Sequence, residues 1–159
     1  DAPKRKAFPK TRALLEAKPN GKKMFKVARE ALVNLGSINN TYKKIAEKNP
    51  DKFCHGFGMF QYDLQFFDAV DPDFFLERKW ATFDGTVGHC VKELKDKIVR
   101  VYGKNKKSLT HDESVYVAIA YNKGSADTSK SFKQGHKDDA GVFYGEHIDE
   151  YLKLANATA

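Results

Sequence analysis

The sequence predicts a mainly α-helical fold with a small irregular or β-like segment near residues 54–63. Long stretches place apolar residues at steps of three and four, as one buried helix face requires. The segment 54–63 interrupts this pattern with closely spaced glycines and aromatic residues. The chain has 159 residues, of which 41% are hydrophobic. A chain of this size and composition can bury a core without disulfide bonds.

Residues 1–22 predict a basic arm. This segment contains three of the five prolines and many lysines, so we expect irregular structure with a short helix around residues 10–18. The rest of the chain, residues 23–159, is expected to form one domain.

The first long helix is expected over residues 23–35. Its apolar residues are too dense for a helix with one buried face, so we expect it to be largely buried and to end at Gly36. Glu30 lies between Val27 and Val33 on this helix. A second helix with a lysine-rich outer face is expected over residues 40–48.

The remaining elements are expected from caps and apolar periodicity. Residues 49–58 predict a loop, and residues 125–141 a second, polar loop. One helix is expected to begin at Asp71-Pro72, an N-cap followed by proline, and a second to run over residues 80–102. A third is expected to begin at Thr110-His111-Asp112-Glu113, a capping box. The last is expected over residues 142–155, with four residues facing inward: Ile148, Tyr151, Leu152 and Ala155.

The charge favours an anionic partner. There are 28 basic and 21 acidic residues, so the net charge is 28 − 21 = +7. Such a surface suits nucleic acid, anionic lipid or an acidic cell-wall polymer. Only five of the basic residues are arginines, which disfavours a sequence-specific DNA reader. The longest apolar run is residues 115–121, too short to span a membrane.

Two motifs carry the chemistry. Residues 56–63 have the sequence GFGMFQYD, in which two glycines allow a sharp turn and the aromatic residues offer flat faces to sugar rings or bases. Residues 118–124 have the sequence AIAYNKG. In this order, the two motifs resemble the glycine–glutamine–aspartate and Ala-Tyr-Asn-x-Gly segments of goose-type lysozymes and soluble lytic transglycosylases. The resemblance covers roughly residues 23–156.

The resemblance implies a lysozyme-like domain over residues 23–159 that cleaves β-1,4 linkages of peptidoglycan or, as a second choice, a chitin-type glycan. It implies a muramidase or a lytic transglycosylase that needs no cofactor or metal. Such a protein is expected to be a monomer in an extracytoplasmic location, secreted or periplasmic. The substrate-binding residues that it implies are Gly58, Gln61, Tyr62, Tyr121 and Asn122.

The resemblance also implies a catalytic glutamate on a buried helix before the glycine loop. Glu30 is our choice over Glu47, because burial between Val27 and Val33 would raise its pKa and keep it protonated as a general acid. Ala31 follows it where the family usually has serine, and the stretch from Glu30 to the glycine loop implies an insertion. Asp63 matches the second carboxylate, with Asp51 as the alternative; hydrolysis needs such a group and transglycosylation does not.

Two alternatives stay open at this point. Cys54 and Cys90 are compatible with free thiols or a disulfide, and less so with a zinc site shared with His55 and His89, since the usual ligand spacing is absent. The second functional hypothesis is a non-catalytic basic module of the same fold that binds nucleic acid or cell-wall glycan.

Overall fold

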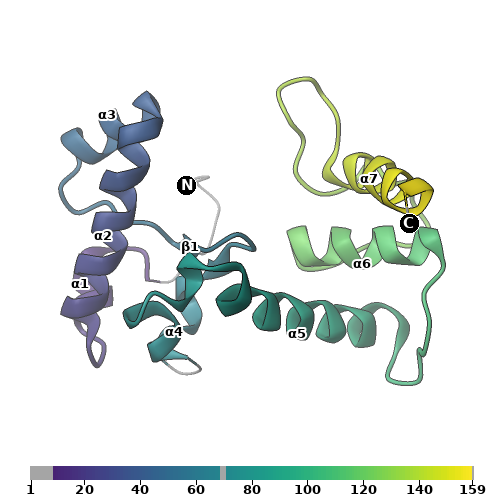
Figure 1. Ribbon diagram of the computed structural model, residues 1–159, viewed down its shortest axis with the longest axis horizontal. Helices are drawn as coiled ribbons and strands as arrows, with labels where there is room; N and C mark the ends of the chain where they lie inside the picture. The colour runs from purple at the N-terminus through teal and green to yellow at the C-terminus, as the bar shows by residue number, and fades with distance from the viewer. Residues whose placement is uncertain (1–8, 69–70, 159) are drawn as a thin grey trace. The chain divides into compact units, whose positions relative to one another are not determined.

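A computed structural model describes residues 9–68 and 71–158 of the chain. It is mainly helical with one small antiparallel sheet, which confirms the predicted fold class (Figure 1). The chain divides into two compact units, 1–89 and 90–159, with the boundary inside the longest helix. This division differs from the expected arm and single domain. The first eight residues of the expected arm lie outside the described part of the chain.

Within its described residues, 9–68 and 71–89, the first unit contains four helices, a hairpin, two short 3₁₀ turns and the start of α5. Its core is dominated by aromatic rings, among them Phe57, Phe67, Phe74 and Phe75, each at most 2% exposed. The elements in chain order are α1 (Arg12–Glu16), α2 (Gly21–Ile38), α3 (Asn40–Lys48), β1 (Gly56–Phe57), β2 (Tyr62–Asp63), η1 (Leu64–Phe66), α4 (Pro72–Leu76), η2 (Lys79–Ala81) and α5 (Phe83–Tyr102).

Helix α1 lies within the expected arm and belongs to the core. Leu15 is 1% exposed, and the Arg12 guanidinium lies over the Phe25 ring at 4.3 Å. The described part of the arm therefore packs on the domain as the short helix that was expected near residues 10–18.

Helix α2 differs from its prediction in two ways. It continues past Gly36 to Ile38, and Gly36 instead lets the backbone of α3 approach: a Cβ at Gly36 would lie 3.0 Å from the Cα of Lys43. Its buried residues, which include Met24, Ala28 and Leu32, follow one stripe, whereas Val33 is 50% exposed. The helix is therefore buried on one face and not largely buried.

Arg29 of α2 caps the C-terminal end of α3. Its guanidinium donates to the main-chain carbonyls of Ala46, Asn49 and Lys52, at 2.6–3.0 Å. These carbonyls lie at the C-terminal turn of α3 and in the loop behind it, where helix geometry leaves acceptors without partners. One arginine thus fixes the loop that leads to the hairpin.

The second unit consists of the rest of α5, α6 (His111–Lys123) and α7 (Tyr144–Thr158). Helix α6 is buried on several sides, with Val115, Ile119 and Ala120 all at 0% exposure. Gly145 at the start of α7 lets that helix approach closely, since a Cβ there would lie 2.7 Å from Ile119 Cδ1. Tyr151 is 62% exposed and Ala155 is exposed as well, so the prediction that these two residues face inward is wrong.

The two N-caps predicted from the sequence are confirmed. Asp71 accepts from the Phe74 amide at 3.1 Å, and Thr110 and Glu113 form a reciprocal capping box.

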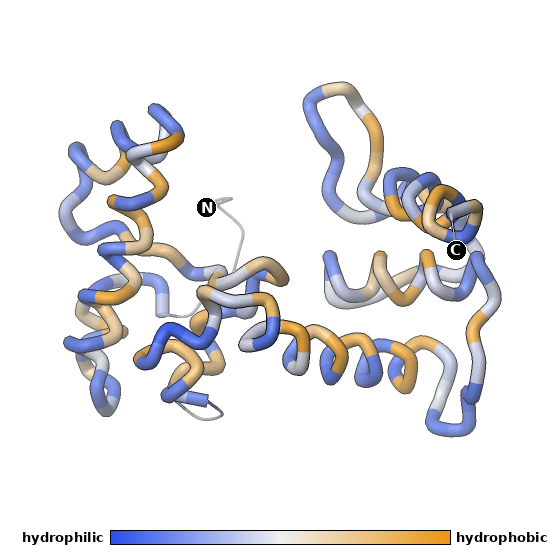
Figure 2. Tube along the Cα trace, viewed as in Figure 1, coloured by the Kyte–Doolittle hydropathy of each residue, from blue (hydrophilic) through white to orange (hydrophobic). Residues whose placement is uncertain are grey.

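Figure 2 shows hydrophobic and hydrophilic residues alternating turn by turn along α5. In the described residues, no helix has the length and apolarity that a membrane span requires.

Candidate functional site

The segment 56–63 forms a tight β-hairpin. Gly56 pairs with Asp63 and Phe57 with Tyr62, which leaves a four-residue tip, 58–61. Gly58 has φ +72, and a Cβ there would lie 2.5 Å from Thr86 Cγ2 and 2.8 Å from the Trp80 carbonyl oxygen. Only glycine fits this position without strain, so Gly58 shapes the site by letting the tip lie against η2 and α5.

The inner side of the hairpin is anchored in the aromatic core. The Phe57 ring packs edge-on against Phe75 at 5.3 Å and against Trp80 at 5.2 Å. Tyr62 stacks on Phe66 at 5.1 Å. Tyr62, expected to bind substrate, is therefore half-buried and contributes a ring to the scaffold.

The outer side of the hairpin carries exposed apolar groups. Met59 is 68% exposed at the tip, and Phe60 lies 6.0 Å from the ring of Phe83, which is itself 53% exposed. We call Met59, Phe60 and Phe83 the apolar ledge. Gln61 follows directly, with φ +54, and its side-chain nitrogen Nε2 donates to the Gly58 carbonyl at 3.0 Å. The side-chain oxygen of this exposed glutamine lies over Gly56, where an added Cβ would be 2.5 Å from it.

His89 lies in this region, although the sequence suggested it only as a ligand of a possible zinc site. Its ring lies 4.6 Å from the rings of both Tyr62 and Phe74, and its Nε2 lies 3.0 Å from an oxygen of Asp71. No sequence motif signals this cluster, because its members come from β2, α4 and α5.

Glu30 is not the buried acid that the sequence predicted. Both carboxylate oxygens accept from Arg78, at 3.0 and 2.7 Å, and the side chain is 49% exposed. The hydrogen bonds and the charge of Arg78 hold the pKa of Glu30 below its usual value. The prediction of burial with a raised pKa is therefore wrong: Val27 and Val33 do not cover the carboxylate, and a residue far along the chain reaches it.

The other acids considered for catalysis lie in different surroundings. Asp51 is exposed and lies 3.2 Å from Arg12. Glu47 is exposed on α3 and lines a pocket between α2 and α3. Asp63 accepts from the Gln65 amide at 2.9 Å, so it caps η1 and orders the end of the hairpin.

Tyr121 and Asn122 belong to the second unit. Burial is the main cause that raises the pKa of Tyr121 to about 12, and its hydroxyl is hydrogen-bonded to the side chain of Cys90. Asn122 accepts from the His136 amide at 2.9 Å. Both residues thus have structural partners, and Asn122 fixes the loop between α6 and α7.

Both cysteines are free thiols, and burial raises the pKa of each. Across the described ranges, no group of three or more His, Cys, Asp or Glu residues could hold a metal ion.

Comparison with known proteins returns no relative. No protein-family profile, no curated protein and no solved structure matches this chain. The resemblance to goose-type lysozymes and lytic transglycosylases stays a prediction from the two short motifs, residues 56–63 and 118–124.

Proposed function

We propose that this protein acts on the glycan strands of peptidoglycan, as a muramidase or lytic transglycosylase, and that the hairpin 56–63 holds the strand. The observation that carries the proposal is the apolar ledge beside Gln61. Exposed apolar groups gathered at one place are typical of binding sites. A pyranose ring has apolar C–H faces and polar edges, so the ledge can cover a face while Gln61 bonds an edge.

The net charge supports a wall polymer as the substrate. Peptidoglycan with its associated polymers is anionic, and a charge of +7 draws the protein towards such a surface. This attraction increases the rate at which the protein meets the wall, whereas the hairpin determines which sugar is bound.

Cleavage requires a proton donor, and Glu30 is the proposed one. It meets this requirement only after Arg78 has moved away, because the ion pair keeps the carboxylate ionised. Arg78 has φ +57, a conformation that residues other than glycine seldom adopt, and it lies two residues before Trp80, which packs against the hairpin. We therefore propose that a bound strand displaces the 77–80 turn and frees Glu30.

A second candidate is binding without cleavage, to cell-wall glycan or to nucleic acid. The Glu30–Arg78 ion pair favours it, since an acid held in this way does not donate a proton.

The test combines two measurements on purified sacculi: loss of turbidity and co-sedimentation. We expect the protein to sediment with sacculi and to clear them, and Glu30→Gln to sediment without clearing. Met59→Ser should weaken both, whereas Leu154→Ser, a matched control that is 64% exposed on α7, should change neither.

Three outcomes would contradict the proposal in different ways. Sedimentation without clearing by the unaltered protein supports the second candidate. Clearing by Glu30→Gln removes Glu30 from the mechanism. Failure to sediment, together with salt-sensitive retention on DNA, assigns the charge to nucleic acid.

A further inference from the structure

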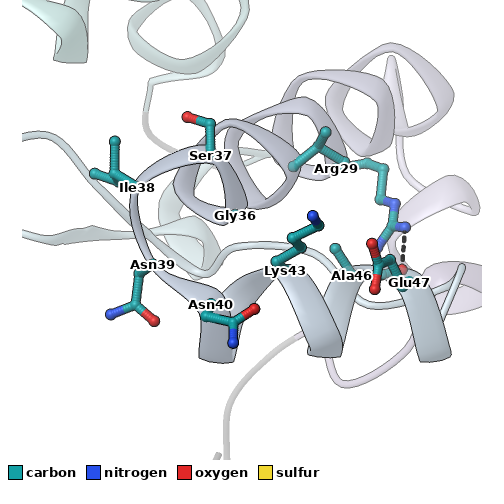
Figure 3. A pocket seen from close by; sticks show the side chains of 10 residues that line it. Arg29, Gly36, Ser37, Ile38, Asn39, Asn40, Lys43, Ala46 and Glu47 are labelled. Carbon is teal, nitrogen blue, oxygen red and sulfur yellow. Dashed lines mark hydrogen bonds between the residues drawn. The ribbon is translucent and has the colours of Figure 1, made fainter.

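A pocket of about 580 Å³ lies between α2 and α3, on the side where the two helices meet at Gly36 (Figure 3). This volume falls within the usual range for small-molecule sites. The pocket lies outside the hairpin, and no step of the proposed cleavage uses it.

Two opposite charges face the pocket. Lys43 and Glu47 lie on consecutive turns of α3, and Figure 3 shows both side chains directed to the space beside Arg29. Within residues 9–68 and 71–158, neither side chain makes an ion pair or a hydrogen bond. The nearby Arg29 already donates to three carbonyl oxygens. An ammonium group and a carboxylate therefore remain available to a ligand, and the backbone positions that carry them are about 6 Å apart along the helix axis.

The wall beside these charges is apolar and open. Val33 is 50% exposed and Ile38 is 83% exposed, and both line the pocket. Covering such side chains with an apolar group of a ligand removes their surface from water, which favours binding. A ligand with charge alone would leave this surface uncovered.

We propose that this pocket binds a short zwitterionic peptide, with its carboxylate at Lys43, its ammonium at Glu47 and an apolar side chain against Val33 and Ile38. The two ends of an extended dipeptide are about 7 Å apart, close to one helical turn. A polyanion fits less well, because Glu47 would repel it. The proposal is independent of glycan binding by the hairpin.

The test is a titration of ¹⁵N-labelled protein with the dipeptide Ala-Leu, followed by amide chemical shifts. We expect saturable shifts confined to the α2–α3 region, with weaker binding of the C-terminal amide and of the N-acetylated form. Lys43→Met should weaken binding of Ala-Leu about two- to fivefold, as should Glu47→Gln, since exposed ion pairs are weak. Lys44→Met, on the same helix but outside the pocket lining, is the matched control and should change nothing.

The pairing of variants with blocked peptides makes the test specific. Lys43→Met should not further weaken binding of the peptide with a C-terminal amide, and Glu47→Gln should not further weaken binding of the N-acetylated peptide. The proposal is overturned if no saturable shift occurs up to about 10 mM, or if blocking either end leaves the affinity unchanged. It is also overturned if inorganic phosphate binds as well as Ala-Leu and binds more tightly to Glu47→Gln, since the pocket is then an anion site.

Discussion

Gly58→Ala should destabilise the first unit by about 2–5 kcal/mol. A left-handed backbone costs an L residue about 1–2 kcal/mol, and φ at this position is +72. The added methyl group would lie 2.5 Å from Thr86 Cγ2 and 2.8 Å from the Trp80 carbonyl oxygen, and forced overpacking costs about 1–3 kcal/mol more. The hairpin tip must then move, and the apolar ledge with it.

Two other glycines separate these costs. Gly124 has φ +90, and a Cβ added there would meet nothing within 4 Å, so Gly124→Ala should show the backbone cost alone, about 1–2 kcal/mol. Gly88 lies inside α5, where an added Cβ would also meet nothing within 4 Å, so Gly88→Ala should stabilise by about 0.5–1 kcal/mol.

Denaturant unfolding measures these differences. The fluorescence of Trp80, the single tryptophan, reports on the first unit, and far-ultraviolet circular dichroism reports on both units. Thr86→Ser removes the nearest clashing atom, so in the Gly58→Ala background it should recover part of the lost stability. If Gly58→Ala costs no more than Gly124→Ala, or if Thr86→Ser shows no coupling, the close approach at the hairpin tip is refuted.

Three further predictions address the ion pair, a cap and a buried phenol. Arg78→Gln should raise the pKa of Glu30 towards its usual value, which a carboxyl NMR titration measures; an unchanged pKa would contradict the ion pair. Thr110→Ala should lower the free energy of unfolding of the second unit by about 1 kcal/mol through loss of the cap, as measured by denaturant unfolding, whereas Thr128→Ala in the following loop should have little effect. The pKa of Tyr121 in the folded state is about 12, against 10.0 for the free side chain, so its contribution to stability should be complete below pH 10 and should decline as the pH rises towards 12. Absorbance at 295 nm measures the ionisation, and denaturant unfolding at pH 9 and 11 measures the decline in stability. Tyr121→Phe should remove that part of the decline.

Features that depend on neighbouring residues could be predicted from the sequence. The Asp71 cap and the Thr110–Glu113 capping box bring together groups three residues apart, so their partners are visible in the sequence. The tight turn at 56–63 follows in the same way from its two glycines.

Features that depend on distant residues could not be predicted. The partner of Glu30 is Arg78, 48 positions away, and periodicity alone gave no reason to expect it. Gly36 is a residue type that often ends helices, yet α2 continues past it, because glycine is needed here for a different reason: α3 lies too close to leave room for a side chain. The turn of the candidate site could thus be predicted from its own residues, whereas the state of Glu30 was predicted wrongly.

The three hydrogen bonds of Arg29 have a consequence for how this part of the chain opens. Because they join α2 to the end of α3 and to residues 49 and 52, the loop before the hairpin cannot separate from α2 without breaking the two bonds to Asn49 and Lys52. The amide of Cys54, which donates to the Ala28 carbonyl one residue before Arg29, should then exchange its hydrogen with solvent at a rate close to that of α2 amides. Lysine at position 29 would keep the charge but lose the planar array of donors, so this loop would open as a separate unit.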